Sequence, residues 1–302
     1  MNIIIDPERG RKAARELYDS FNTTGIHGRK DMPEDVLPKG VERDSLDHIL
    51  FITFTVSIDY MRDANSLWEA SRKTFEDPRT RYLYQPSELY KISLQQIIAD
   101  MQVHKLSKKM NQDATTWRRI GITLHEKWGG DPRKFLESCG WDNLVILKRL
   151  AIDSHLENGL RTHDFPFLKG PKIGPLWLRM LRDNIGITNL RKFDEVPIPV
   201  DGHVARATLS LGVVRGNYQG NLSDLHPFIR KAWFESVKGL YINGHPMIAL
   251  DLDEPLWHLS KYGCTFRDKE TGECPVKSRC EMKDFCIPGK INITDGYLEL
   301  DT

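Results

Sequence analysis

Apolar residues recur every three or four positions along much of this chain, which is the spacing of one face of an α-helix. In residues 7–22, Ala13, Leu17 and Phe21 follow this spacing between charged residues. We therefore expect an amphipathic helix there. The same pattern predicts further helices over residues 86–102, 111–128, 133–138, 142–157, 175–185, 225–239 and 254–262, and another that begins near Asp201.

Two segments near the N-terminus do not follow this pattern simply. Residues 23–44 are rich in Gly, Pro and charge, and we expect them to connect helices. Residues 44–75 contain no Gly or Pro, but their centre, FITFTVSI, is β-branched and would suit a strand by propensity alone. Because charged helix formers flank it on both sides, we favour one or two buried helices.

Strand patterns are scarce and no internal repeat is visible. The sequence therefore predicts an all-α protein whose helices are joined by short polar loops. A length of 302 residues exceeds what one small domain needs, so two lobes are expected. Hydrophobic residues make up 40% of the chain and include seven tryptophans, which is enough for a substantial core.

The net charge of +1 neither indicates nor excludes a nucleic-acid partner, because binding depends on where charge lies. No apolar run reaches the roughly 18 residues of a membrane span, so no membrane partner is expected. The start, MNIIIDPERG, lacks the pattern of a signal peptide. We expect an intracellular protein of the cytoplasm or nucleoid, in a reducing compartment where structural disulfides are uncommon.

Four of the five cysteines cluster near the C-terminus with the spacing C-x9-C-x5-C-x5-C. Thiolates are soft ligands, and four of them can hold a [4Fe–4S] cluster or zinc. Structural zinc sites usually contain CxxC pairs, which are absent here, so the spacing favours iron–sulfur over zinc. Unmetallated thiols or disulfides are the third interpretation. The predicted ligands are Cys264, Cys274, Cys280 and Cys286, whereas Cys139 stands alone and is expected to be buried.

A glycine-containing basic turn precedes the apolar helix expected near residue 175. Gly170 and Gly174 bracket the turn, which can present backbone N–H groups and a helix N-terminus to an anion. Residues 161–192 carry seven Lys or Arg against two Asp, a local charge of +5. This density is expected of a contact with the DNA backbone. The alternative is an ordinary turn with solvated basic residues.

Asp201 lies in the sequence PVDGHVARA, at the expected start of a helix. An Asp in this position is suited to cap the helix, and this interpretation is strong by itself. A carboxylate at a helix start can also stabilise a developing oxocarbenium ion and orient a water molecule. His203 is expected to pack or cap rather than to take part in catalysis.

Taken in order, the basic turn, the Asp201 segment and the cysteine tail resemble the helix-hairpin-helix (HhH-GPD) DNA glycosylases with an iron–sulfur loop, the group of endonuclease III and adenine DNA glycosylase. The corresponding segments are LKGPKIGPLWLRML, PVDGHVARATLSLGVV and LWHLSKYGCTFRDKETGECPVKSRCEMKDFC. The resemblance covers most of residues 45–286. Its most specific part is VDGHVAR together with the four cysteines.

The resemblance implies two helical lobes, with DNA bound across the cleft between them and the damaged base flipped out of the duplex. Residues 46–198 would form a six-helix barrel lobe that includes the helix-hairpin-helix motif. Residues 199–302 would form the helical lobe with the cluster, and residues 1–45 would pack with it. A monomer that binds double-stranded DNA with a damaged or mismatched base is expected.

The resemblance also assigns roles to individual residues. Asp201 matches the family's essential Asp, and the four cysteines match its cluster ligands. The phosphate-gripping hairpin corresponds to Lys169, Gly170, Lys172 and Gly174. A bound cluster would order a basic loop for DNA contact, which contains Arg267, Lys269, Lys277, Arg279 and Lys283.

Two departures from the family pattern qualify these roles. The usual cluster spacing is C-x6-C-x2-C-x5-C, and the first two gaps here are each three residues longer. In members that also cut the strand, a Lys lies two residues beyond the second hairpin glycine; here that position is Gly174 or Leu176, depending on the register. Neither side chain can form a Schiff base. The sequence therefore favours a monofunctional glycosylase.

Three other functions stay open. One is a non-catalytic DNA-binding iron–sulfur protein, although the presence of Asp201 argues against it. Another is a bifunctional glycosylase and abasic-site lyase in which Lys172 reaches the sugar from its neighbouring position. The third is a zinc-stabilised module that binds protein or RNA and has no glycosylase function.

Overall fold

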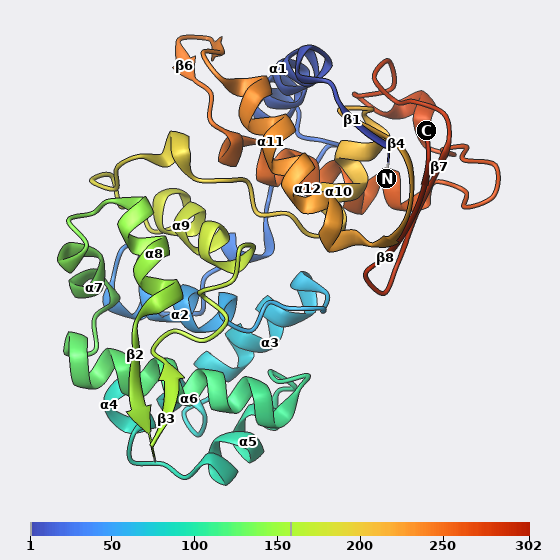
Figure 1. The fold of residues 1–302 in the computed structure, drawn as a ribbon. Helices are drawn as coiled ribbons and strands as arrows, with labels where there is room; N and C mark the ends of the chain where they lie inside the picture. The colour runs from blue at the N-terminus through green and yellow to red at the C-terminus, as the bar shows by residue number, and fades with distance from the viewer. Residues whose placement is uncertain (1, 158) are drawn as a thin grey trace. The chain divides into compact units, whose positions relative to one another are not determined.

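The computed structural model describes residues 2–157 and 159–302 (Figure 1). These residues divide into two compact units. We call Met32–Lys192 the central unit, and Met1–Asp31 together with Phe193–Thr302 the terminal unit. Twelve α-helices lie within the described ranges, so the predicted helical character is confirmed. The prediction of an all-α protein was too strong, because both units also contain strands.

The β-branched segment before residue 57 is helical, as the sequence analysis favoured. Ser45 caps α2 (Leu46–Val56) by accepting a hydrogen bond from the amide of His48. Residues His48 to Val56 are all buried, so tertiary packing outweighs the strand propensity of this segment. Phe54 stacks on Trp117 with ring centroids 5.0 Å apart in an aromatic core. This core gives the central unit a rigid base for its loops.

The other helices of the central unit follow the predicted periodicity, with one interruption. The helix expected over residues 86–102 is divided in two, because Tyr90–Ser93 leave the helical path and Ser93 caps the second part. The remaining helices are α3 (Ala64–Glu76), α4 (Pro86–Leu89), α5 (Leu94–Val103), α6 (Met110–Trp128), α7 (Pro132–Ser138), α8 (Asn143–Ile152) and α9 (Ile173–Asp183).

The helix predicted over residues 142–157 is too long, because α8 ends at Ile152. The strands β2 (Ser154–Glu157) and β3 (Leu160–His163) follow as an antiparallel hairpin. Its base is held by His155, whose Nδ1 lies 2.7 Å from Asp164 Oδ1 and whose Nε2 lies 2.7 Å from Arg119 Nη1. The Asn-Gly pair at positions 158 and 159 is a hairpin signal that the helical periodicity obscured.

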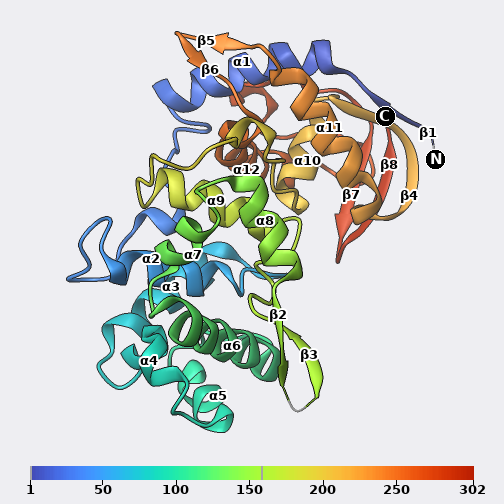
Figure 2. The ribbon, with the colours of Figure 1, turned by 60° about the vertical axis from the view of Figure 1, so that its left-hand side comes forward.

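The terminal unit combines helices with a four-stranded antiparallel sheet in the order β1-β4-β8-β7, whose strands lie side by side in both views (Figures 1 and 2). The turn between β7 and β8 contains Asp295 and Gly296, both with positive φ. This conformation suits a two-residue hairpin turn. The strands are β1 (Asn2–Ile5), β4 (Val214–Asn221), β7 (Lys290–Thr294) and β8 (Tyr297–Asp301), and a short hairpin joins β5 (Tyr241–Ile242) to β6 (His245–Pro246).

Four helices pack with this sheet and bury one continuous apolar core. The central one, α10, buries Val204, Ala205, Ala207 and Leu209 and packs against α12. The helices are α1 (Pro7–Thr23), α10 (Gly202–Ser210), α11 (His226–Val237) and α12 (Asp253–Tyr262). In the described part of the chain, no helix has the length and apolar character that crossing a membrane requires.

Candidate functional site

Asp201 is the N-cap of α10. Its Oδ1 atom accepts hydrogen bonds from the amides of His203 and Val204, at 2.8 and 3.0 Å. The capping role is therefore confirmed. The two amide donors and the positive end of the helix dipole stabilise negative charge at this position. The side chain is half-buried, so it retains access to a ligand.

His203 packs and forms a hydrogen bond, as expected. Its Nδ1 lies 3.1 Å from Ser260 Oγ on α12, and its ring lies edge-on to Trp257 at 5.6 Å. These contacts fix α10 against α12. They hold the start of α10, and with it the Asp201 carboxylate, in one position.

Two basic residues near Asp201 were not identified from the sequence. Burial lowers the pKa of Arg206, while the charges of Cys264 and Asp201 act in the opposite direction. Burial lowers the pKa of His226 to about 4, with Arg230 acting in the same direction and Asp201 against it. His226 is therefore neutral at pH 7, whereas Arg206 is a cation that interacts electrostatically with both the candidate carboxylate and the first cysteine.

The four predicted metal ligands line a single pocket. The pocket lies at the end of α10, where Ser210 and Leu211 form part of its wall. All four cysteines are free thiols. The complete lining consists of Ser210, Leu211, Leu259, Gly263, Cys264, Cys274, Lys277, Cys280, Met282 and Cys286.

Cys264 and Cys280 are half-buried and pack against the apolar core of the terminal unit. Burial raises the pKa of Cys264 to about 12 and that of Cys280 to about 11, and the neighbouring cysteines add to both shifts. Thiols so close together cannot all ionise without a cation to offset their charge. Cys286 receives a hydrogen bond from Arg267, whose Nη2 lies 3.1 Å from its sulfur.

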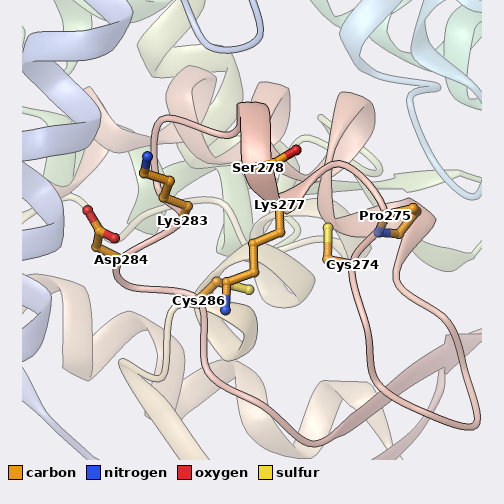
Figure 3. Close-up of a pocket in the computed structure, with 7 residues that line it drawn as sticks. All are labelled: Cys274, Pro275, Lys277, Ser278, Lys283, Asp284 and Cys286. Carbon is orange, nitrogen blue, oxygen red and sulfur yellow. The ribbon is translucent and has the colours of Figure 1, made fainter.

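The outer side of the pocket is open. Cys274 and Cys286 also line a wider surface pocket with Lys277 and Lys283, which Figure 3 shows. Two thiols thus face the interior of the terminal unit, and two lie at its surface. Four soft donors, one open side and basic groups around the thiols fit a metal group held by four thiolates.

Arg267 does not belong to a DNA-contacting loop surface. Its side chain is 7% exposed, and it donates hydrogen bonds to the carbonyl oxygens of Ile287 and Gly289 as well as to Cys286. The expectation that it faces DNA was therefore wrong. Its role is to hold the loop around the cysteines.

The predicted phosphate-gripping turn lies directly before α9. Gly174 is buried in the first turn of this helix, and a Cβ there would lie 2.8 Å from the carbonyl oxygen of Leu168 and 2.9 Å from Leu147 Cδ2. Only glycine permits this close approach between the turn and α8. Lys169 is exposed, whereas Lys172 is half-buried with its Nζ 3.7 Å from Asp59 Oδ2.

The local charge of +5 overstates the basic surface around this turn. Arg179 is buried and ion-paired with Glu34. Lys192 pairs with Asp142, and Arg182 pairs with Asp183. Lys169 and Lys172 are the basic residues of the turn itself.

An exposed aromatic group lies beside the turn and was only a weak signal in the sequence. Tyr60 is 45% exposed and Met61 is 59% exposed. Lys109 Nζ lies 4.3 Å from the centroid of the Tyr60 ring, and the Phe167 ring lies 6.0 Å from it. We call Tyr60, Met61, Lys108, Lys109 and Phe167 the tyrosine–lysine patch. It combines a flat apolar surface with cations, which suits stacked bases and phosphates.

Comparison with solved structures identifies known proteins with a similar fold. The chain is similar to a trapped endonuclease III–DNA covalent intermediate, described as an estranged-adenine complex, with a TM-score of 0.52 and 15% identity over 93% of this chain and 99% of that one. It is also similar to a non-covalent endonuclease III–DNA complex, with a TM-score of 0.53 and 15% identity over 93% of this chain and 98% of that one.

No protein-family model and no curated protein sequence matches the chain. The structural comparison therefore establishes the fold alone: the chain has a predominantly helical fold similar to that of endonuclease III. The resemblance inferred from the basic turn, Asp201 and the cysteines is confirmed at that level.

Proposed function

We propose that this protein is a DNA-repair glycosylase that hydrolyses the N-glycosidic bond of a flipped, damaged or mismatched base. The main observation behind the proposal is that helix α10 connects the candidate carboxylate to the cysteine pocket. This helix has Asp201 at its N-terminus and forms a wall of the four-cysteine pocket at its other end. The similarity to two endonuclease III–DNA complexes supports DNA as the partner.

In this proposal Asp201 is the catalytic residue. Its ionised carboxylate stabilises positive charge on the deoxyribose as the base leaves, and then orients water at C1′. The two amides that bind Oδ1 hold the carboxylate in a fixed orientation. His226 is neutral and does not add positive charge next to the developing cation.

The reaction is proposed to be monofunctional. Lys172 is the amine nearest to the family's nucleophilic position, and its Nζ lies 3.7 Å from Asp59 Oδ2 and 3.4 Å from the carbonyl oxygen of the same residue. A Schiff base with the sugar would require this amine to leave its contacts with Asp59. This contact supports hydrolysis without strand cleavage.

For DNA binding, we propose that the turn of Lys169, Gly170, Lys172 and Gly174 contacts phosphates. The tyrosine–lysine patch extends this surface within the central unit, since Phe167 precedes the turn and contacts Tyr60. We further propose that the central and terminal units act as the two lobes. Their boundaries fall at residues 31/32 and 192/193, which are 14 and 6 residues before the expected limits at 45 and 198.

The proposed cofactor is a [4Fe–4S] cluster held by Cys264, Cys274, Cys280 and Cys286, with zinc as the alternative. When bound, the cluster would supply structural order to the loop between the cysteines. Free thiols in this number also fit a protein that works beside DNA inside the cell, where thiols stay reduced. Iron and sulfide analysis of anaerobically purified protein distinguishes the two metals.

The decisive experiment uses labelled duplexes that contain uracil, thymine opposite guanine, 8-oxoguanine, adenine opposite 8-oxoguanine, oxidised pyrimidines or alkylated purines. Each product is analysed with and without hot alkali, for the wild type and for Asp201→Asn. Strand breaks that need alkali and vanish in the variant would establish a monofunctional glycosylase and identify its substrate.

Other outcomes would change the assignment. Breaks without alkali, together with a borohydride-trapped adduct, would show lyase activity and implicate Lys172. DNA binding without cleavage of any substrate would favour a non-catalytic DNA-binding protein.

A further inference from the structure

A tight turn in the N-terminal segment of the terminal unit presents His27 at its tip. Ile26 and Arg29 exchange two backbone hydrogen bonds, of 2.9 and 3.0 Å. His27 and Gly28 between them have φ angles of 51° and 69°. Positive φ is uncommon for residues other than glycine, so this geometry holds His27 in a defined direction.

The turn is attached to the cysteine loop. The amide of His27 donates a hydrogen bond of 3.0 Å to Glu281 Oε1. A Cβ at Gly263 would lie 2.4 Å from His27 Nε2 and 2.7 Å from the carbonyl oxygen of Leu259. The residue directly before Cys264 must therefore be glycine for the imidazole to occupy its place.

The imidazole lies next to one of the four candidate ligands. A ring nitrogen of His27, the sulfur of Cys280 and a carboxylate oxygen of Glu281 all lie within 4.8 Å of one another. The His27 side chain is 9% exposed. Among the described residues, its Nε2 atom has no hydrogen-bond partner. A buried ring nitrogen without a partner destabilises the folded protein, so a hydrogen-bond partner at this position would be stabilising.

An imidazole carries an N–H on at least one ring nitrogen in either of its protonation states. The thiolate of a metal-bound cysteine is an acceptor for such a donor, and hydrogen bonds to the sulfurs are one of the means by which a protein sets the properties of an iron–sulfur cluster.

We infer that His27 is a positioning residue for the metal centre, with a ring N–H donated to the sulfur of Cys280 when the cluster is bound. Glu281 fixes the turn through the His27 amide, and Gly263 leaves room for the ring. This inference rests on the proposed iron–sulfur cofactor. It assigns a function to the N-terminal turn that the four cysteines alone do not explain.

The consequence is electrochemical. Reduction adds negative charge to the cluster and its sulfurs, and an N–H directed at one sulfur stabilises the reduced state more than the oxidised state. Removal of the donor should therefore make the reduction potential more negative. Iron and sulfide content should stay at the wild-type level, because all four ligands remain.

The test compares wild-type protein with His27→Phe and His27→Gln by spectroelectrochemical titration, after iron and sulfide have been measured in each. We expect a more negative potential in His27→Phe and a potential close to wild type in His27→Gln, which keeps an N–H donor. His245→Phe is the matched control. His245 lies in β6, where it pairs with Asp251 and stacks on Tyr18, and its replacement should leave the potential unchanged.

Equal potentials in wild type and His27→Phe, with equal cluster content, would overturn the inference and leave the cofactor intact. A wild-type protein that contains zinc and no sulfide would overturn both the inference about His27 and the proposed iron–sulfur cofactor. If His27→Phe holds no cluster, pulsed EPR of reduced wild-type protein with ¹⁵N-labelled histidine decides. A nitrogen coupling that is lost in His27→Gln supports the contact, and its absence in the wild type refutes it.

Discussion

The guanidinium of Arg179 donates a hydrogen bond to the carboxylate of Glu34, and both side chains are almost completely buried, with exposed fractions of 1% and 2%. This ion pair joins the 3-10 turn Pro33–Asp35 to α9 within the central unit. It fixes the first residues of that unit to the helix that follows the basic turn.

Removal of one residue of this ion pair should destabilise the folded protein, because the charge of the other residue is then buried without a partner. We expect Arg179→Met to lower the free energy of unfolding by about 3–5 kcal/mol. Arg182→Met, which breaks a partly exposed pair with Asp183, should cost about 1 kcal/mol or less. Thermal unfolding followed by circular dichroism measures both. An equal decrease in the free energy of unfolding for the two variants would show that burial does not make the Arg179–Glu34 pair more important for stability.

Variants of Asp201 should separate capping from chemistry. Asparagine also caps helices, so Asp201→Asn should keep the stability of the terminal unit and abolish base excision. Asp201→Ala should abolish excision and also lower stability by about 1 kcal/mol. Duplex cleavage, DNA affinity and thermal unfolding are measured for each variant. Retained excision in Asp201→Asn would refute the catalytic role.

Replacement of a pocket cysteine should remove the metal. We expect Cys280→Ser to lose most of its iron and sulfide and to unfold at a lower temperature, since metal binding stabilises the folded state. Cys139 is a matched control because it is 4% exposed and lies outside the pocket. Cys139→Ala should keep the wild-type metal content. Equal metal content in both variants would contradict the four-cysteine site.

The tyrosine–lysine patch should contribute to DNA affinity through stacking. We expect Tyr60→Ala to weaken binding by about 1–3 kcal/mol and Tyr60→Phe to have little effect. Tyr90 offers a control in the same unit, since it is 43% exposed and stacks on His125. Tyr90→Ala should bind DNA like the wild type in a fluorescence-anisotropy titration. Unchanged binding by Tyr60→Ala would exclude the patch from the interface.

Acidification should destabilise the terminal unit through His258. Burial lowers the pKa of this fully buried side chain to about 4. Between that value and the ordinary value near 6.5, the unfolded chain binds a proton that the folded chain does not. Stability from this group is therefore complete above pH 6.5, falls by up to roughly 3 kcal/mol as the pH drops to 4, and changes no further below.

The variant His258→Phe tests this pH dependence. Phenylalanine can pack beside Phe21 and Tyr262, which both contact the ring of His258. We expect denaturant unfolding of the variant to vary less with pH between 6.5 and 4 than that of the wild type. Parallel pH profiles would show that another group is responsible.

The sequence predicted most helices because their apolar periodicity reports directly on burial. It missed the strands, which are short. The pair Asp295–Gly296 marks a hairpin turn, and residues 290–301 form β7 and β8 around it, where no element was predicted. The first strand of the hairpin after α8 was included in a predicted helix, because Ile152 and Leu156 continue the helical spacing.

The number of basic residues in a segment predicted the DNA-contacting surface poorly, whereas residue spacing predicted helices and the cysteine pocket well. Arg179 and Arg267 were both counted as DNA-contacting residues, and both are buried, one against Glu34 and the other against Cys286 and backbone carbonyl oxygens. A count of charges cannot show which of them are paired in the interior. The four cysteines were different: their clustering along the chain already indicated the pocket that they line.

The construction of α10 has a mechanical consequence. Its nine residues, roughly 14 Å of helix, separate the Asp201 carboxylate from the wall of the cysteine pocket. An α-helix resists compression along its axis, so the two ends cannot shift independently. The position of the Asp201 carboxylate therefore depends on how rigidly the four-cysteine pocket holds the other end of α10, although the two sites share no side chain.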